Sequence, residues 1–99
     1  MAGEYVATVT VNRSGRILSA DKMFCRMFGF KPGECKWHYI CDCVGGVESW
    51  AHIRDNLITG DIRAHSRNRR AFRCSIAPAI EMIEGKQAYT CKFTKKQKH

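Results

Sequence analysis

The chain has 99 residues, and its Lys and Arg outnumber Asp and Glu by 17 to 9, for a formal net charge of +8. With 44% hydrophobic residues the composition excludes a disordered chain, and the length predicts one domain with its own core. No apolar run approaches the ~20 residues that cross a bilayer, and the first residues lack the pattern of a secretory leader, so we expect a cytoplasmic, reducing environment.

The first part of the chain predicts a β-hairpin followed by a short helix. Residues 4–12 are β-branched and roughly alternating, which is typical of a strand, and residues 16–20 form a second strand after a turn. Gly15 gives that turn its positive φ at little cost. Asp21 is placed to cap the helix, in which apolar residues recur at helical spacing until Gly29 ends it.

The second part predicts one longer helix and three strands. Residues 47–60 return to the helical period, and Gly60 is expected to end this helix. Strands are expected over 61–66, 69–80 and 85–95. In the last two strands apolar and polar side chains alternate, as a sheet with one buried face requires. The side chains expected to face the helices are Phe72, Cys74, Ile76, Tyr89, Cys91 and Phe93.

The order of these elements defines the expected fold class. Two strands, a group of helices and three further strands indicate an α+β fold. We expect a five-stranded antiparallel sheet, with short helices and one longer helix packed on one face. A single domain then spans residues 1–95, and residues 96–99 form a basic tail.

Several motifs in this order resemble those of the PAS (Per-Arnt-Sim) domain. GRILSADKMFCRMFGFKPGE at 15–34 is similar to the family's Gly turn, short strand and helix ending in an apolar-Gly-aromatic run. LITG at 57–60 and YTCKFTK at 89–95 resemble the ends of the family's long helix and last strand. The resemblance covers nearly the whole chain. It implies a central cavity between sheet and helices, in a family whose members sense small molecules, haem or flavin, or pair with other domains.

The resemblance implies a non-enzymatic sensory or regulatory module. Such a module binds a small apolar ligand or a protein partner, which can be a second copy of the chain, and relays a signal to an effector. Methionine and aromatic side chains suit a flexible apolar ligand. The residues expected to line the cavity are Met23, Met27, Trp37, Trp50, Leu57, Cys74, Ile76, Tyr89, Cys91 and Phe93.

Residues 35–43, CKWHYICDC, place four soft metal ligands within nine positions: Cys35, His38, Cys41 and Cys43. On a regular helix or strand these side chains point in different directions, and their spacing is not that of a zinc finger. We therefore interpret the cysteines as buried packing thiols with one reactive member. A small zinc module is the alternative. In a reducing compartment the six cysteines are expected to stay free.

His52, on the predicted long helix, is the candidate ligand for haem, which some PAS sensors bind through a histidine there. It lies two residues from Trp50, so the two side chains face different sides of a helix. The Asn-Cys-Arg-Phe run that flavin photochemistry needs is absent from this segment. No segment pairs a nucleophile with a base. We therefore expect no catalysis and no cofactor, with haem or zinc as the alternatives.

Much of the positive charge gathers in two segments, 63–73 and 92–99. Neighbouring strands would merge these charges into one basic strip for an anionic partner, which gives the second alternative function: contact with nucleic acid or acidic lipid. Aromatic residues here alternate inward instead of interleaving with the charges, so nucleic acid is not favoured. The residues of this surface are Arg63, Arg67, Arg69, Arg70, Arg73, Lys92, Lys95 and Lys96.

Overall fold

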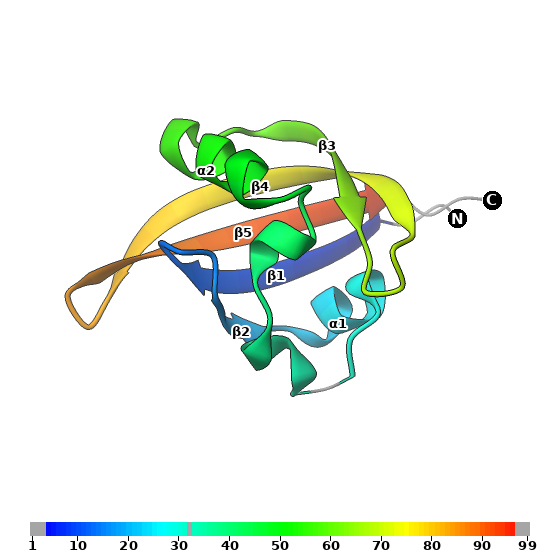
Figure 1. Ribbon diagram of the computed structural model, residues 1–99, viewed down its shortest axis with the longest axis horizontal. Coiled ribbons are helices and arrows are strands. Elements are labelled where there is room, and N and C mark those ends of the chain that lie inside the picture. The colour runs from blue at the N-terminus through cyan, green and yellow to red at the C-terminus, as the bar shows by residue number, and fades with distance from the viewer. Residues whose placement is uncertain (1–3, 32, 97–99) are drawn as a thin grey trace.

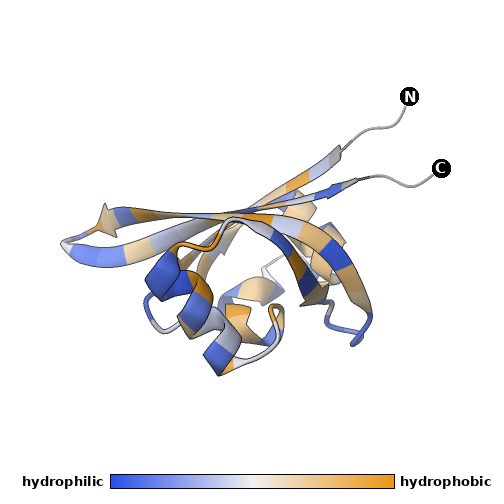
Figure 2. Cartoon of the chain, turned by 90° about the horizontal axis from the view of Figure 1, so that it is seen from above, coloured by the Kyte–Doolittle hydropathy of each residue, from blue (hydrophilic) through white to orange (hydrophobic). Residues whose placement is uncertain are grey.

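The structure is a computed structural model that describes residues 4–31 and 33–96. The elements in chain order are β1 (Glu4–Asn12), β2 (Ile17–Ala20), α1 (Lys22–Phe28), the 3-10 turns η1 (Glu34–Trp37) and η2 (Ile40–Asp42), α2 (Val47–Asn56), β3 (Gly60–His65), β4 (Ala71–Ile83) and β5 (Lys86–Lys96). The strands form one antiparallel sheet in the order β2-β1-β5-β4-β3 (Figure 1). The helices cover one face of it, as Figure 2 shows, which confirms the predicted α+β fold class.

The alternation of side chains along the strands decides which face the helices cover. Ile76 of β4 lies opposite Phe93 of β5, so the two side chains share a face, and both are buried. Phe72 is half-buried, and its ring centroid lies 5.3 Å from that of Phe28 in α1. The predicted inward set is therefore confirmed. Its other members are also buried: Cys74, Tyr89 and Cys91.

The start of α1 is fixed by the side chain of Asp21. One carboxylate oxygen accepts a hydrogen bond from the backbone N–H of Phe24 (2.8 Å), and the other accepts from the N–H of Thr8 in β1 (3.1 Å). At the other end Gly29 takes a left-handed conformation with φ of 78°. Both predicted helix signals are thus confirmed, and the cap also ties the helix to the sheet.

We expect Asp21→Ala to lower the free energy of unfolding by about 1 kcal/mol, because two backbone N–H groups lose their acceptor. Asp21→Asn is the matched control, since its amide oxygen still accepts from Phe24 while its NH2 group cannot accept from Thr8. Urea denaturation of the three proteins measures the effect. An asparagine variant as unstable as the alanine variant would contradict this account of the cap.

Helix α2 ends earlier than the sequence predicted. Leu57 takes a left-handed conformation with φ of 48°, and its N–H donates to the carbonyl oxygen of Ile53. Gly60 then begins β3 instead of ending the helix. Because Leu57 has left the helix, its side chain does not share the buried face of Trp50 and is 40% exposed.

The segment between α1 and α2 forms two short 3-10 turns held by the first hairpin. The N–H of Ile17 donates to the carbonyl oxygen of His38 (3.1 Å), and the N–H of Ile40 donates to that of Gly15 (2.7 Å). Six of its described side chains are buried in the core: Phe30, Cys35, Ile40, Cys41, Cys43 and Val44. These turns are therefore fixed by contacts with a distant part of the chain.

The opposite face of the sheet carries no helix among the described residues, and the β4–β5 hairpin extends beyond the helices (Figure 1). Met82 near the tip of this hairpin is 63% exposed. Glu4 pairs with Lys96, so the two ends of the described chain lie side by side on neighbouring strands. In the described part of the chain we found no helix with the length and apolar character needed to span a membrane. The predicted basic tail lies outside the described residues except for Lys96.

Candidate functional site

A pocket of about 470 Å³ opens between the 3-10 turns and the turn that joins β3 to β4. It combines aromatic, imidazole and guanidinium groups with one carboxylate, a mixture that suits a polar organic ligand. The residues that line it are Phe30, His38, Asp42, Cys43, His65, Ser66, Arg67 and Arg69.

Backbone hydrogen bonds hold the walls of this pocket together. The N–H of His65, at the end of β3, donates to the carbonyl oxygen of Cys43 (2.8 Å). The N–H of Arg67 donates to that of Phe28 in α1 (2.8 Å). The first bond joins β3 to the end of η2, and the second joins the turn at residues 66–70 to α1. The pocket therefore lies where the sheet meets its helical cover.

His65, which lines the pocket, has one polar atom without a partner in the described part of the chain. His65 Nδ1 is buried and makes no hydrogen bond within residues 4–31 and 33–96. An unpaired buried nitrogen costs free energy of about 1–3 kcal/mol, so a ligand that bonds it recovers that cost. In the same pocket the ring of Phe30 lies against that of His38, with centroids 4.8 Å apart.

The two arginines of the pocket differ in their partners. Arg67 donates to the carboxylate of Glu34 and forms an ion pair with it. Desolvation acts to raise the pKa of Glu34, but hydrogen bonds from Arg67 and the Lys31 backbone, together with nearby positive charge, lower it overall. Arg69 is exposed at the pocket and has no ion pair among the described residues. Of the two arginines that line the pocket, Arg69 is therefore the one without an ion pair in the described part of the chain.

Neither protein-family models nor curated proteins match this chain. Solved structures do: a PAS domain from a two-component sensor histidine kinase superposes with a TM-score of 0.76 at 17% identity, over 94% of this chain and 86% of the other. The chain has the PAS fold. The PAS domain of a Desulfitobacterium hafniense protein gives a TM-score of 0.76 at 12% identity, over 94% and 93% of the two chains. The PAS domain of the fruit-fly ELK potassium channel gives 0.69 at 11% identity, over 96% and 89%.

The residues predicted to line a central PAS cavity fall into separate places. Six of them are buried in the core: Trp50, Cys74, Ile76, Tyr89, Cys91 and Phe93. Met23 and Met27 instead line a smaller pocket of about 360 Å³ with Tyr5, Arg26 and Lys95. Leu57 is exposed, which corrects its placement in the cavity, and the side chain of Trp37 lies outside the described part of the structure.

Aromatic rings occupy the core of this PAS fold. The ring centroid of Phe24 lies 4.6 Å from that of Phe28 and 6.0 Å from that of Phe93. Trp50 meets Tyr89 edge-on at 5.8 Å. Three of the predicted cavity residues thus contact other core side chains: Trp50, Tyr89 and Phe93. The larger of the two pockets described above lies beside the β3–β4 turn.

The four candidate zinc ligands do not form a site. Among the described residues no group of three or more His, Cys, Asp or Glu side chains is placed to hold a metal ion. Burial, together with the charge of Asp42, raises the pKa of Cys43 to about 12 and also raises that of Cys41. Because these side chains do not converge, the placement of the described residues gives the zinc alternative no support.

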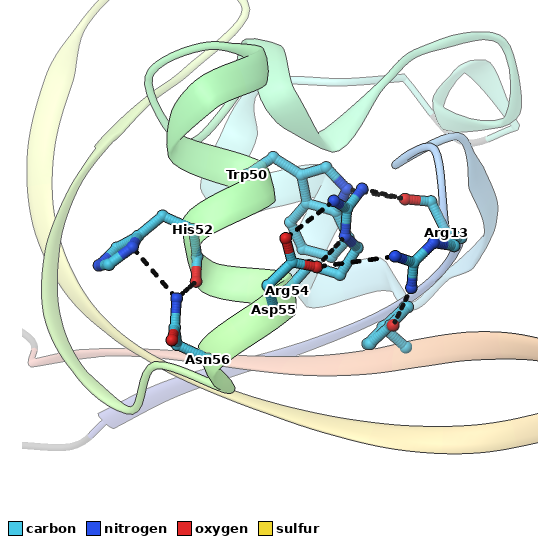
Figure 3. A network of polar contacts seen from close by, with 7 residues as sticks. Arg13, Trp50, His52, Arg54, Asp55 and Asn56 are labelled. Atoms are coloured by element: carbon cyan, nitrogen blue, oxygen red, sulfur yellow. Dashed lines mark hydrogen bonds and ion pairs between the residues drawn. The ribbon is translucent and has the colours of Figure 1, made fainter.

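His52 lies on the solvent side of α2, apart from Trp50 (Figure 3). The side-chain amide of Asn56 lies 3.2 Å from its Nδ1 and donates to its carbonyl oxygen at 3.0 Å. An exposed imidazole on the solvent side of α2 gives no support for an axial haem ligand in this PAS fold.

The predicted basic strip is divided between two faces of the sheet. Arg63 and Arg73 lie directly opposite each other on β3 and β4, and both are exposed. Lys95 faces the helical side, where its Nζ lies 4.7 Å from the ring centroid of Phe72. The remaining charges are Arg67 and Arg69 at the pocket, Arg70 beside it, exposed Lys92, and Lys96, whose side chain lies outside the described part. The single continuous strip is therefore corrected to separate groups.

Sequence reasoning missed Phe30, Asp42, His65 and Ser66 as residues of the pocket. It assigned His38 and Cys43 to a metal, and Arg67 and Arg69 to a surface strip. The usable signal was the dense run of arginines immediately after His65. This run of arginines does not itself show that the turn folds back onto α1 and η2.

Proposed function

We propose that the chain is a sensory or regulatory module, and that a small molecule occupies the pocket beside the β3–β4 turn. The observation that carries the proposal is that His65, which lines a pocket of about 470 Å³, has a buried Nδ1 with no partner among the described residues. A PAS domain of a sensor histidine kinase and one of a potassium channel share the fold, which supports a regulatory role without catalysis.

The lining of the pocket favours a small planar molecule that carries a carboxylate. The ring of Phe30 offers an apolar surface, and His65 Nδ1, unpaired among the described residues, is available for one hydrogen bond. The free guanidinium of Arg69 binds carboxylates in a two-pronged geometry. This ligand is more polar than the apolar molecule expected from the sequence, because the pocket lies at the β3–β4 turn and not among the core aromatic rings.

The position of the pocket gives such a ligand a route to the rest of the molecule. Two backbone hydrogen bonds at the pocket join β3 and the β3–β4 turn to the helical cover. One runs from His65 to Cys43, and the other from Arg67 to Phe28. A ligand that binds one arrangement of these segments more tightly shifts the population toward it. The uncovered sheet face, with Val6 and Leu18 exposed, is the proposed surface for a partner or effector domain.

We expect benzoate to bind more tightly than acetate, because only benzoate adds a ring to lie on Phe30. Arg69→Ala is expected to weaken benzoate binding about tenfold or more, since a charge-assisted hydrogen bond contributes about 1.5–3 kcal/mol. Arg70→Ala is the matched control, because this neighbouring arginine does not line the pocket. Isothermal titration calorimetry and chemical-shift mapping at His65 measure both effects.

Two results would contradict the proposal. One is equal weakening by the Arg69 and Arg70 variants, which would show only a general charge effect. The other is a bare chain in native mass spectra together with no binding of either carboxylate at millimolar concentration. A doubled mass in the same spectra would instead favour pairing with a second copy of the chain.

A further inference from the structure

Two cysteine sulfur atoms lie in direct contact beneath the surface. Cys25 belongs to α1 and Cys35 to η1, and their Sγ atoms are 3.1 Å apart. A disulfide requires a separation of about 2.05 Å, so the sulfurs need to approach by roughly 1 Å. Cys25 lies outside the predicted 35–43 cluster, and neither residue lines the pocket described above.

The fold of the intervening chain brings these two residues together. The N–H of Phe30 donates to the carbonyl oxygen of Cys25 (2.9 Å), and Gly29 reverses the chain direction with φ of 78°. Gly33, with φ of 83°, precedes η1 and places Cys35 back against α1. The left-handed conformations of Gly29 and Gly33 thus accompany the return of the chain from α1 to the sulfur contact.

The two thiols differ in their access to solvent. Cys25 is half-buried, so a small oxidant in solution reaches it, whereas Cys35 is only 3% exposed. Burial, and then the contact with Cys25, raises the pKa of Cys35 to about 12. This difference suits Cys25 to react first and Cys35 to act second as the resolving thiol.

The other four cysteines lack the solvent access of Cys25 and, among the described residues, a contact with another sulfur atom. Cys41, Cys43, Cys74 and Cys91 are all buried, and no sulfur–sulfur contact involves them among the described residues. Desolvation raises the pKa of Cys91 to about 12 and that of Cys74 to about 11. A buried thiol with no sulfur atom in contact has neither access to an oxidant in solution nor a partner for a disulfide.

We propose that Cys25 and Cys35 form a reversible disulfide in response to hydrogen peroxide, which makes this chain a thiol-based redox sensor. The Cys25 thiolate attacks one peroxide oxygen, the O–O bond breaks, and the departing hydroxide takes up the thiol proton as water. The sulfur of Cys35 then attacks Cys25 sulfenic acid, the S–O bond breaks, and a second water leaves with the Cys35 proton. Two thiols and one peroxide thus give one disulfide and two waters, and an external dithiol reverses the oxidation.

The bond would also act on the neighbouring pocket. The loop closed by Cys25 and Cys35 contains Phe30, and His38 follows at the end of η1. Fastening η1 to α1 therefore restrains two of the pocket's rings. The redox proposal itself does not depend on a ligand in that pocket.

The test uses the full chain, reduced and then exposed to hydrogen peroxide. After denaturation and alkylation we expect four alkylated cysteines in place of six, and a tryptic fragment that joins Cys25 to Cys35. Dithiothreitol is expected to restore all six. Cys25→Ser and Cys35→Ser should each abolish the linked fragment, and the Cys35 variant should retain a sulfenic acid that reacts with dimedone. Cys41→Ser is the matched control and should still form the link.

The proposal is overturned if all six thiols remain alkylatable at peroxide concentrations that oxidise free glutathione. It is equally overturned if the linked fragment contains a cysteine other than this pair. Both outcomes are read from the unaltered chain, so they hold even where a serine variant fails to fold. Carboxylate binding by the reduced chain is measured separately, which distinguishes a failure here from a failure of the proposed ligand site.

Discussion

Trp50→Ala is expected to lower the free energy of unfolding by about 3–5 kcal/mol, as for other large buried aromatic residues. Trp50 is 2% exposed, and its ring meets that of Tyr89 edge-on. Its indole N–H donates to the carbonyl oxygen of Arg13 at 3.2 Å (Figure 3). One side chain thus joins α2 to β5 and to the first hairpin, and its loss leaves a cavity between all three.

Urea denaturation measures this effect, and two variants serve as controls. Val47→Ala lies on the same helix at a site that is 72% exposed, so a change within about 0.5 kcal/mol is expected. Trp50→Phe keeps much of the ring and removes the N–H donor. Because Arg54 also donates to the Arg13 carbonyl (3.1 Å), that oxygen keeps a partner, and we expect an intermediate loss. An alanine variant as stable as the Val47 control would contradict this packing.

Gly15→Ala is expected to cost about 2–4 kcal/mol, since two penalties act at one position. The backbone of Gly15 has φ of 89°, a conformation that L side chains rarely adopt. A methyl group there would also lie 3.0 Å from Nε1 of Trp50 and 3.1 Å from Cγ2 of Ile40. Both neighbours belong to the core, so neither can move without opening a gap elsewhere.

Gly85→Ala separates the two penalties. Gly85 has φ of 78° in the β4–β5 turn, and a methyl group there would meet no atom within 4 Å. Its cost therefore measures backbone strain alone, which we expect to be about 1–2 kcal/mol. In a Trp50→Phe background, Gly15→Ala should cost less than in the parent chain. Equal costs at Gly15 and Gly85 would show that the close approach of Trp50 has no energetic consequence.

The parts of the fold that the sequence predicted are those encoded by neighbouring residues. Alternation along β4 and β5 identified the inward face, and Asp21 and Gly29 marked the ends of α1 through local hydrogen bonding and conformation. Short helices were expected besides the longer one, but the bounds of η1 and η2 were not predicted, because hydrogen bonds from Ile17 and to Gly15 in the distant hairpin fix these turns. The early end of α2 also escaped prediction, since it requires a leucine in a left-handed conformation.

The candidate site was much less predictable than the fold. Its walls come from three separated segments, and their meeting depends on backbone bonds such as that from Arg67 to Phe28. The resemblance to PAS domains implied a central cavity between the sheet and the helices. There Phe24 and Phe28 of α1 reach Phe93 of β5, and the rings pack against one another. Ring contacts between distant elements leave no pattern in a single sequence.

The pairing of Glu4 with Lys96 has a mechanical consequence. β1 and β5 are antiparallel neighbours, so the first residue of β1 and the last residue of β5 lie at the same end of the two strands (Figure 1). A force that pulls these two ends apart acts along the ladder of hydrogen bonds and loads them one at a time, like a zipper. The seam between β1 and β5 divides the sheet into β2-β1 and β5-β4-β3, and tension from attached domains would therefore open the molecule along this line first.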